Sequence, residues 1–305
     1  MATLGENLEY LATLAGTGVA QMMPSRMADF TAARLGGLAY HVVPSRRRIA
    51  LDTLSRAFGD SLTAAQQKEI IHHVFQNIGR TLFEFARFRK MSLEDIRRIV
   101  TGPGQEILKK VYAEGKGGIV VTAHFGNWEI LGVWVAACGY PMDFLTGTQH
   151  NEKVNDLLNG FRKEMGVGII SLATSARQVF KALKANHITG LVSDQHSASA
   201  GIVLDFMGRP ASTPKGPALF ALRSGCPLLP FLLRRERYDH HVLIPGEPIY
   251  PPRGGDEETN IREMTAAYTR FFEAQIRKYP EQWMWTHRRW KVPEQQPAGE
   301  VQTAG

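Results

Sequence analysis

The sequence is poor in features that mark several other classes of protein. It has 2 cysteines in 305 residues, Cys138 and Cys226, both in apolar surroundings and without the spacing of metal ligands. Neither a disulfide framework nor a zinc site is indicated, and a reducing compartment fits best. The Gly-x-Ser-x-Gly elbow of serine hydrolases is missing. Repeats and low-complexity tracts are also missing, so one domain with terminal extensions is the simplest organisation.

A long hydrophobic run is another feature that the sequence lacks. The uncharged stretch YLATLAGTGVAQMMPS, between Glu9 and Arg26, is diluted by threonine, glycine and glutamine. A bilayer crossing needs about 20 predominantly apolar residues. A weaker apolar segment followed by Arg26 and the run 46–48 instead predicts a helix lying in the membrane interface. The alternative is an ordinary helix packed on the domain, and no cleavable signal peptide is indicated.

The charge balance favours negatively charged partners. The chain has 36 Lys+Arg against 29 Asp+Glu, a formal net charge of +7. Nucleic acid, anionic lipid headgroups and an acidic carrier protein would all suit this excess. The basic residues are not interleaved with aromatic residues and no nucleic-acid-binding motif is present, so a lipid surface is favoured over nucleic acid.

The hydrophobic pattern predicts an α/β fold. Apolar residues recur at helical spacing from residue 63 to 90. Short β-branched runs then alternate with amphipathic segments. Strands are expected at 119–123, 142–146, 167–171, 188–193 and 227–235, and helices at 127–138, 152–165, 174–185 and 214–224. This order predicts a mixed, partly parallel sheet covered by helices.

Three regions are expected along the chain. Residues 1–60 form an N-terminal helical, membrane-associating region, and residues 61–292 form the α/β domain. Residues 293–305 are polar and rich in Gln, Glu, Pro and Gly, which predicts a disordered tail.

The segment GGIVVTAHFGNWEILG, residues 117–132, carries the most chemistry. Its first half predicts a buried strand, and its second half begins a helix with Asn127 as N-cap and Glu129 in the first turn. His124 therefore stands at the carboxyl end of a strand, where open α/β sheets bind ligands. Glu129 can fold back to bond one ring nitrogen of His124, which leaves the other nitrogen to accept a proton. A buried structural histidine is the alternative.

Several blocks of the sequence resemble one known family. HFGNWE at 124–129 resembles the His-x4-Asp/Glu signature of the lipid A biosynthesis (lauroyl/myristoyl-type) acyltransferase family. Similar blocks, in the same order, are SRRRIALDTLSRAF at 45–58, NIGRTLFEFARF at 77–88, SDQH at 193–196, FMGRPASTPKGPALFALRSGCPLLP at 206–230 and PEQWMWTHRRWK at 280–291. The resemblance extends over nearly the whole chain.

The resemblance implies roles for particular residues. His124 would be the general base and Glu129 its orienting partner. Arg162, Asp194 and Gln195 would line the donor or acceptor site. Asp194 follows the apolar run 188–193 and is thereby expected at the same sheet edge as His124. Arg162 is alternatively an exposed helix residue, and Asp194 a turn or capping residue.

Two further segments are candidates for binding. Ser212-Thr213-Pro214-Lys215-Gly216 fits an N-cap followed by a proline at the first helical position. Thr213 and Lys215 could then bind a phosphate or the thioester oxyanion, or cap a helix that binds nothing. The tryptophan-rich block 280–291 suits a lipid headgroup surface, although its tryptophans could equally be core residues, and Trp285 is expected in the core.

The resemblance implies transfer of a fatty acyl chain to a hydroxyl of a lipid A precursor or related glycolipid. The donor would be acyl carrier protein, with coenzyme A as the second choice, and neither a metal nor another cofactor is implied. The expected location is the cytoplasmic face of the bacterial inner membrane. The alternatives are a lysophospholipid or other glycolipid acyltransferase, and a non-catalytic membrane lipid-binding protein.

Overall fold

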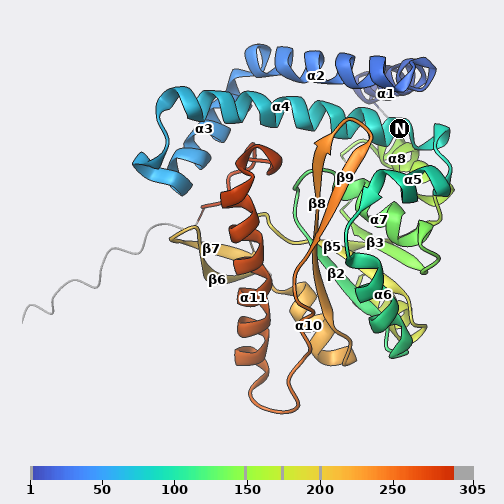
Figure 1. Ribbon diagram of the computed structural model, residues 1–305, viewed down its shortest axis with the longest axis vertical. Coiled ribbons are helices and arrows are strands. Elements are labelled where there is room, and N and C mark those ends of the chain that lie inside the picture. The colour runs from blue at the N-terminus through green and yellow to red at the C-terminus, as the bar shows by residue number, and fades with distance from the viewer. Residues whose placement is uncertain (1–2, 148–149, 173–174, 199–200, 292–305) are drawn as a thin grey trace, which may run out of the picture.

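The computed structural model describes residues 3–147, 150–172, 175–198 and 201–291. A central sheet is covered by helices on both faces, and a layer of N-terminal helices lies across one end (Figure 1). The predicted tail at 293–305 lies outside the described residues.

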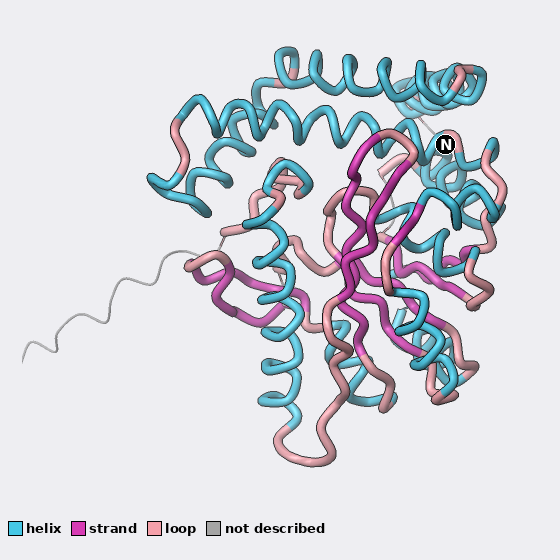
Figure 2. The backbone as a smooth tube through the Cα atoms, in the orientation of Figure 1, coloured by secondary structure: helices cyan, strands magenta, loops and turns pink. Residues whose placement is uncertain are grey.

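The central sheet has seven strands in the order β1-β9-β8-β2-β5-β3-β4. The strands are β1 (Val100–Thr101), β2 (Gly118–Thr122), β3 (Met142–Thr146), β4 (Val167–Ser171), β5 (Ile188–Val192), β8 (Leu228–Arg237) and β9 (His240–Pro245). All pairings are parallel except that of β8 with β9. The predicted mixed, partly parallel sheet is confirmed, and Figure 2 shows its strands between the helices.

Eleven α-helices lie within the described residues. They are α1 (Leu4–Met22), α2 (Ser25–Val42), α3 (Pro44–Phe58), α4 (Ala64–Ala86), α5 (Leu93–Ile99), α6 (Gly104–Ala113), α7 (Trp128–Ala137), α8 (Glu152–Glu164), α9 (Ser175–Lys184), α10 (Gly216–Ser224) and α11 (Glu257–Lys278). Short 3-10 helices are η1 (Gly59–Ser61), η2 (Phe88–Lys90) and η4 (Pro280–Gln282).

Side chains of β2 point alternately to the two faces of the sheet, and each face carries its own hydrophobic core. Ile119 and Val121 point into a core with α3, α4, α9, α10 and α11, whereas Val120 points into a core with α5, α6, α7 and α8. Successive side chains of a strand face opposite sides of the sheet, so an apolar run such as IVV needs helices on both faces. Every residue of β2 is buried.

The N-terminal helices are built around α4. Glycines allow α2 to cross α4 closely: a Cβ at Gly36 would lie 2.3 Å from the carbonyl oxygen of Phe75, and one at Gly79 would lie 2.4 Å from that of Ala32. A search of the described helices finds none with the length and apolar character that a bilayer crossing requires. The expected helix in the uncharged N-terminal stretch is present as α1.

Two features depart from the sequence predictions. Residues 201–206 and 209–214 form a separate antiparallel hairpin of β6 (Gly201–Phe206) and β7 (Arg209–Pro214). Ser212, Thr213 and Pro214 thus belong to a strand, and α10 begins only at Gly216 with Lys215 as its N-cap. The predicted helix start was wrong because the proline in the first turn is Pro217, which satisfies the same N-terminal preference.

Candidate active site

His124 and Asp194 face each other at one edge of the sheet. Thr122 of β2 lies opposite Val192 of the adjacent parallel strand β5. Two residues further along each strand, the Nδ1 atom of His124 lies 2.8 Å from Oδ1 of Asp194. The register of two parallel strands therefore brings the pair together at their carboxyl ends, where α/β sheets bind ligands.

The Asp194 carboxylate is buried and held by three contacts. Besides the His124 ring, Oδ2 accepts the backbone N–H of His124 at 3.0 Å and the indole N–H of Trp283 at 2.7 Å. Burial raises the pKa of Asp194, but the charge of His124 and these hydrogen bonds outweigh it, so the net pKa lies below its usual range. Asp194 is thus an ionised acceptor that fixes the ring of His124.

The loop that carries His124 is closed by the C-terminal segment. Met284 donates its backbone N–H to the carbonyl of His124 at 2.9 Å, and Gly126 donates to the carbonyl of Gln282 at 2.8 Å. From the other side, the Thr81 hydroxyl donates to the carbonyl of Gly126 at 3.0 Å. The loop is therefore fixed by groups from α4 and from residues 282–284.

Gly126 occupies a position that requires glycine. Its φ is +55°, and a Cβ there would lie 1.8 Å from the carbonyl oxygen of Leu233. The next residue, Asn127, accepts the backbone N–H of Ile130 at 3.0 Å, so its predicted role as N-cap of α7 is confirmed. The tight turn lets the chain leave β2 and enter α7 within five residues.

One ring nitrogen of His124 remains available for chemistry. Nδ1 is bonded to Asp194, whereas Nε2 has no hydrogen-bond partner among the residues that the structure describes. The side chain is 21% exposed and borders a cavity of only about 10 Å³, beside α4 and Trp283. Trp128 meets the imidazole edge-on with ring centroids 4.9 Å apart.

Glu129 is bonded to Arg162 rather than to His124, contrary to the sequence prediction. Its two oxygens accept hydrogen bonds from Nε and Nη2 of Arg162 at 2.9 and 2.7 Å. Arg162 also donates to Asn159 and lies over the ring of Phe85. Because the forked guanidinium occupies both oxygens, Glu129 links α7 to α8, and the carboxylate on His124 is Asp194.

Comparison with known proteins identifies the family. A family profile described as "Bacterial lipid A biosynthesis acyltransferase" matches residues 3–292. The chain belongs to this family. The resemblance in the sequence blocks is therefore confirmed.

Individual relatives are distant in sequence. The chain is 26% identical over 131 residues to a phosphatidylinositol mannoside acyltransferase of Mycobacterium tuberculosis, which spans 42% of both chains. It is 24% identical over 297 residues to the lipid A biosynthesis palmitoleoyltransferase of Escherichia coli (95% of this chain, 94% of that protein). It is 27% identical to the Escherichia coli lipid A biosynthesis lauroyltransferase over 269 residues (87% and 85%).

The other predicted site residues are dispersed around this centre. Gln195 directly follows Asp194 and is partly buried. Thr213 is buried in β7, where its hydroxyl accepts a hydrogen bond from Nη2 of Arg289 at 2.6 Å. Lys215 lies at the start of α10, and its side chain makes no capping hydrogen bond. The structure thus joins Asp194 directly to His124, and Thr213 to Arg289.

The block at 280–291 contributes more to the site than its sequence indicated. Trp283 and Trp285 are buried with exposures of 2% and 0%, so Trp285 is a core residue as expected, and Trp283 orients Asp194. His287 was not singled out as a site residue. Burial, with nearby Lys291, lowers the pKa of His287 to about 4, and the charges of Asp194 and His124 also act on it. Its buried Nδ1 has no hydrogen-bond partner in the described part of the chain.

Proposed function

We propose that this protein transfers a fatty acyl chain from a thioester donor to a hydroxyl of a lipid A precursor or related glycolipid. The observation that carries the proposal is the His124–Asp194 pair at the sheet edge of a chain in this family. A neutral imidazole with Nδ1–H directed at a carboxylate has a basic Nε2.

The residues support direct transfer. Nε2 of His124 takes the proton of the acceptor hydroxyl as its oxygen attacks the thioester carbonyl. A C–O bond forms and the C–S bond breaks. The proton then passes from His124 to the departing thiolate, so the site is restored. Asp194 stabilises the imidazolium between these steps, a part that the sequence had given to Glu129.

The donor in this proposal is acyl carrier protein. The net charge of +7 favours an acidic carrier through steering that weakens as salt rises. Lys163 on α8 is exposed and available for such steering. Arg162 is not, because Glu129 neutralises it. Steady-state rates with both donors carrying the same acyl chain test this: a clear advantage for coenzyme A, or a rate with the carrier indifferent to salt, would reject it.

A mannosylated phospholipid is the second candidate acceptor. The observation in its favour is the similarity to phosphatidylinositol mannoside acyltransferases, which covers under two thirds of their length. The same base would serve a sugar hydroxyl of either lipid. Mass spectrometry of total lipid from cells with and without the protein identifies which lipid loses one acyl mass.

The decisive test is His124→Ala in the purified protein. Loss of the base should reduce transfer by about 10²- to 10⁴-fold. Because the change leaves the buried Asp194 carboxylate without its histidine partner, thermal unfolding of the variant is measured alongside transfer to establish that it is folded at the assay temperature. Undiminished transfer by a folded variant would reject His124 as the base, and a lipid-binding protein without catalysis would then be the better description.

A further inference from the structure

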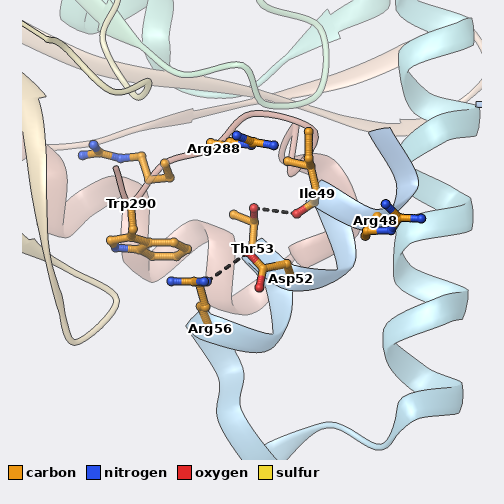
Figure 3. A pocket seen from close by; sticks show the side chains of 8 residues that line it. Arg48, Ile49, Asp52, Thr53, Arg56, Arg288 and Trp290 are labelled. Atoms are coloured by element: carbon orange, nitrogen blue, oxygen red, sulfur yellow. Dashed lines mark hydrogen bonds and ion pairs between the residues drawn. The ribbon is translucent and has the colours of Figure 1, made fainter. Parts of the chain in front are cut away.

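A second, larger cavity lies away from the His124 cavity, between α3 and the C-terminal segment. Its volume is about 370 Å³, which is enough for a phosphorylated sugar or glycerol headgroup. Figure 3 shows side chains of α3 on one side and those of Arg288 and Trp290 on the other. The lining residues are Arg48, Ile49, Asp52, Thr53, Arg56, Arg288, Arg289 and Trp290.

The lining carries a strong excess of positive charge, with four guanidinium groups and one carboxylate. Asp52 is bonded to Nε of Arg56 at 3.0 Å, which leaves the two terminal nitrogens of Arg56 for another partner. Arg48 and Arg288 form no hydrogen bond or ion pair with any residue that the structure describes. An excess of arginines over carboxylates around one cavity indicates a site for an anion that accepts several hydrogen bonds.

The inner wall of the cavity is formed by a buried, hydrogen-bonded arginine. Arg289 is only 1% exposed, and it donates to the Ser212 carbonyl at 2.7 Å and to Thr213. Its Nε is buried and has no hydrogen-bond partner within the described ranges. Arg289 therefore adds a buried positive charge behind the cavity wall, whereas the exposed side chains of Arg56 and Arg288 are the groups that an anion can reach.

The same segment separates the cavity from the catalytic pair. Arg289 lines the cavity and also interacts electrostatically with Asp194. Two residues earlier, His287 interacts with both His124 and Asp194. Residues 287–289 would therefore lie between an anion in the cavity and the hydroxyl that reacts at His124.

We propose that this cavity binds the phosphate of the acceptor lipid's headgroup and so positions its hydroxyl at His124. The inference rests on the proposed function. The acceptor is favoured over the donor because α3 packs on α2 and α4 in the N-terminal layer (Figure 1), and α1 and α2 of that layer expose apolar side chains that suit a lipid surface. The one apolar ring, Trp290, can pack on a sugar or acyl glycerol moiety.

Binding tests the cavity independently of catalysis. Inorganic phosphate and dihexanoylphosphatidic acid, a soluble phosphate-bearing lipid, are titrated calorimetrically into the full chain and into a variant with Arg56→Gln and Arg288→Gln. Both side chains are exposed, so the variant should fold. The lipid should bind more tightly than phosphate, and the variant should bind it roughly 10- to 100-fold more weakly. Equal affinity of variant and parent would overturn the proposal.

The control is Arg46→Gln, which makes one similar charge change on α3 outside the cavity lining. It should bind as the parent does. In kinetics, the double variant should raise KM for the acceptor about tenfold and leave KM for the donor unchanged. A rise in KM for the donor alone would overturn the acceptor assignment. If the parent protein binds the lipid normally but transfers no acyl group to any hydroxyl, the proposed function is refuted and the proposed anion site still stands.

Discussion

At the scale of single residues, two carboxylates near the start of α7 and the end of β5 have different partners. Asp194 is bonded to His124 and Glu129 to Arg162. Asp194→Asn should keep the fold but lower the transfer rate by about 10²- to 10⁴-fold, because an amide favours the wrong tautomer and does not stabilise the imidazolium. Purified variants assayed over a pH range provide the measurement.

Glu129→Gln should act on stability instead. It leaves the Arg162 guanidinium, 13% exposed, without its charge partner and should lower the free energy of unfolding by about 2–3 kcal/mol. Urea unfolding measures this. Combining it with Arg162→Gln should recover part of the loss. A fully stable Glu129→Gln protein with the turnover defect of Asp194→Asn would restore Glu129 as the orienting partner.

His287 makes stability depend on pH. Its pKa is lowered from 6.5 to about 4 by burial and by nearby Lys291. The unfolded chain therefore binds a proton more readily, and stability is lost as pH falls from about 6.5 to about 4. Since the ring is half-buried, we expect a loss of only about 1–2 kcal/mol. Asp194 adds most of its loss below this window, because its pKa is lowered from a usual value of 3.8.

Thermal unfolding at several pH values measures this effect. His287→Gln should flatten the profile between pH 6.5 and 4. A variant with the same slope as the parent would show that the acid sensitivity arises elsewhere.

At the scale of elements, the turn from β2 to α7 depends on Gly126. Gly126→Ala would place a Cβ against the Leu233 carbonyl at a positive φ, and should cost about 3 kcal/mol or more of unfolding free energy. Gly115→Ala is the control: φ is +70° but nothing lies within 4 Å of its Cβ. It should cost only about 1–2 kcal/mol. Equal losses in the two variants would show that the contact with β8 is unimportant.

The elements themselves were largely predictable because hydrophobic runs of β2, β3, β4, β5 and β8 are bounded by clear breaks. Asp194 was expected at the same sheet edge as His124, but the bond between them was not predicted. The bond depends on β5 lying next to β2 although β3 and β4 intervene in the sequence. Glu129 is close to His124 in sequence and was therefore predicted as its carboxylate partner. In the structure, Arg162 of the neighbouring helix α8 binds the Glu129 carboxylate instead. Neither fact is encoded in local spacing.

At the scale of the whole molecule, the outer helices present apolar surface. Leu4, Leu8, Leu11 and Met22 of α1 are 56% to 85% exposed, and their spacing places them on one face of the helix. Helix α2 also exposes apolar side chains, namely those of Met27, Phe30, Leu35, Leu38 and Val42. Such patches with basic residues nearby suit the surface of an anionic membrane.

We therefore expect the protein to float with vesicles of anionic phospholipid. Replacing Leu8, Leu11 and Phe30 with serine should reduce the bound fraction by about tenfold or more, since each buried side chain contributes about 1.5–3 kcal/mol. The matched control replaces exposed Leu172, which lies outside these helices, with serine. Binding that survives the triple change, or that the control also abolishes, would reject the α1–α2 surface.

The closure of the His124 loop by residues 282–284 has a consequence for the timing of folding. The candidate active site joins positions separated by 70 residues at His124–Asp194 and by 89 at Asp194–Trp283. In addition, Asn77 of α4 bonds to Glu281 across 204 residues. As the chain emerges from the ribosome, β2, α7 and β5 are synthesised first. The His124 loop and Asp194 lack their contacts with Trp283 and Met284 until those residues have been made. The contacts that orient His124 can thus form only after residues 281–284 have been synthesised, because contacts of such long range form after the rest of the domain has collapsed.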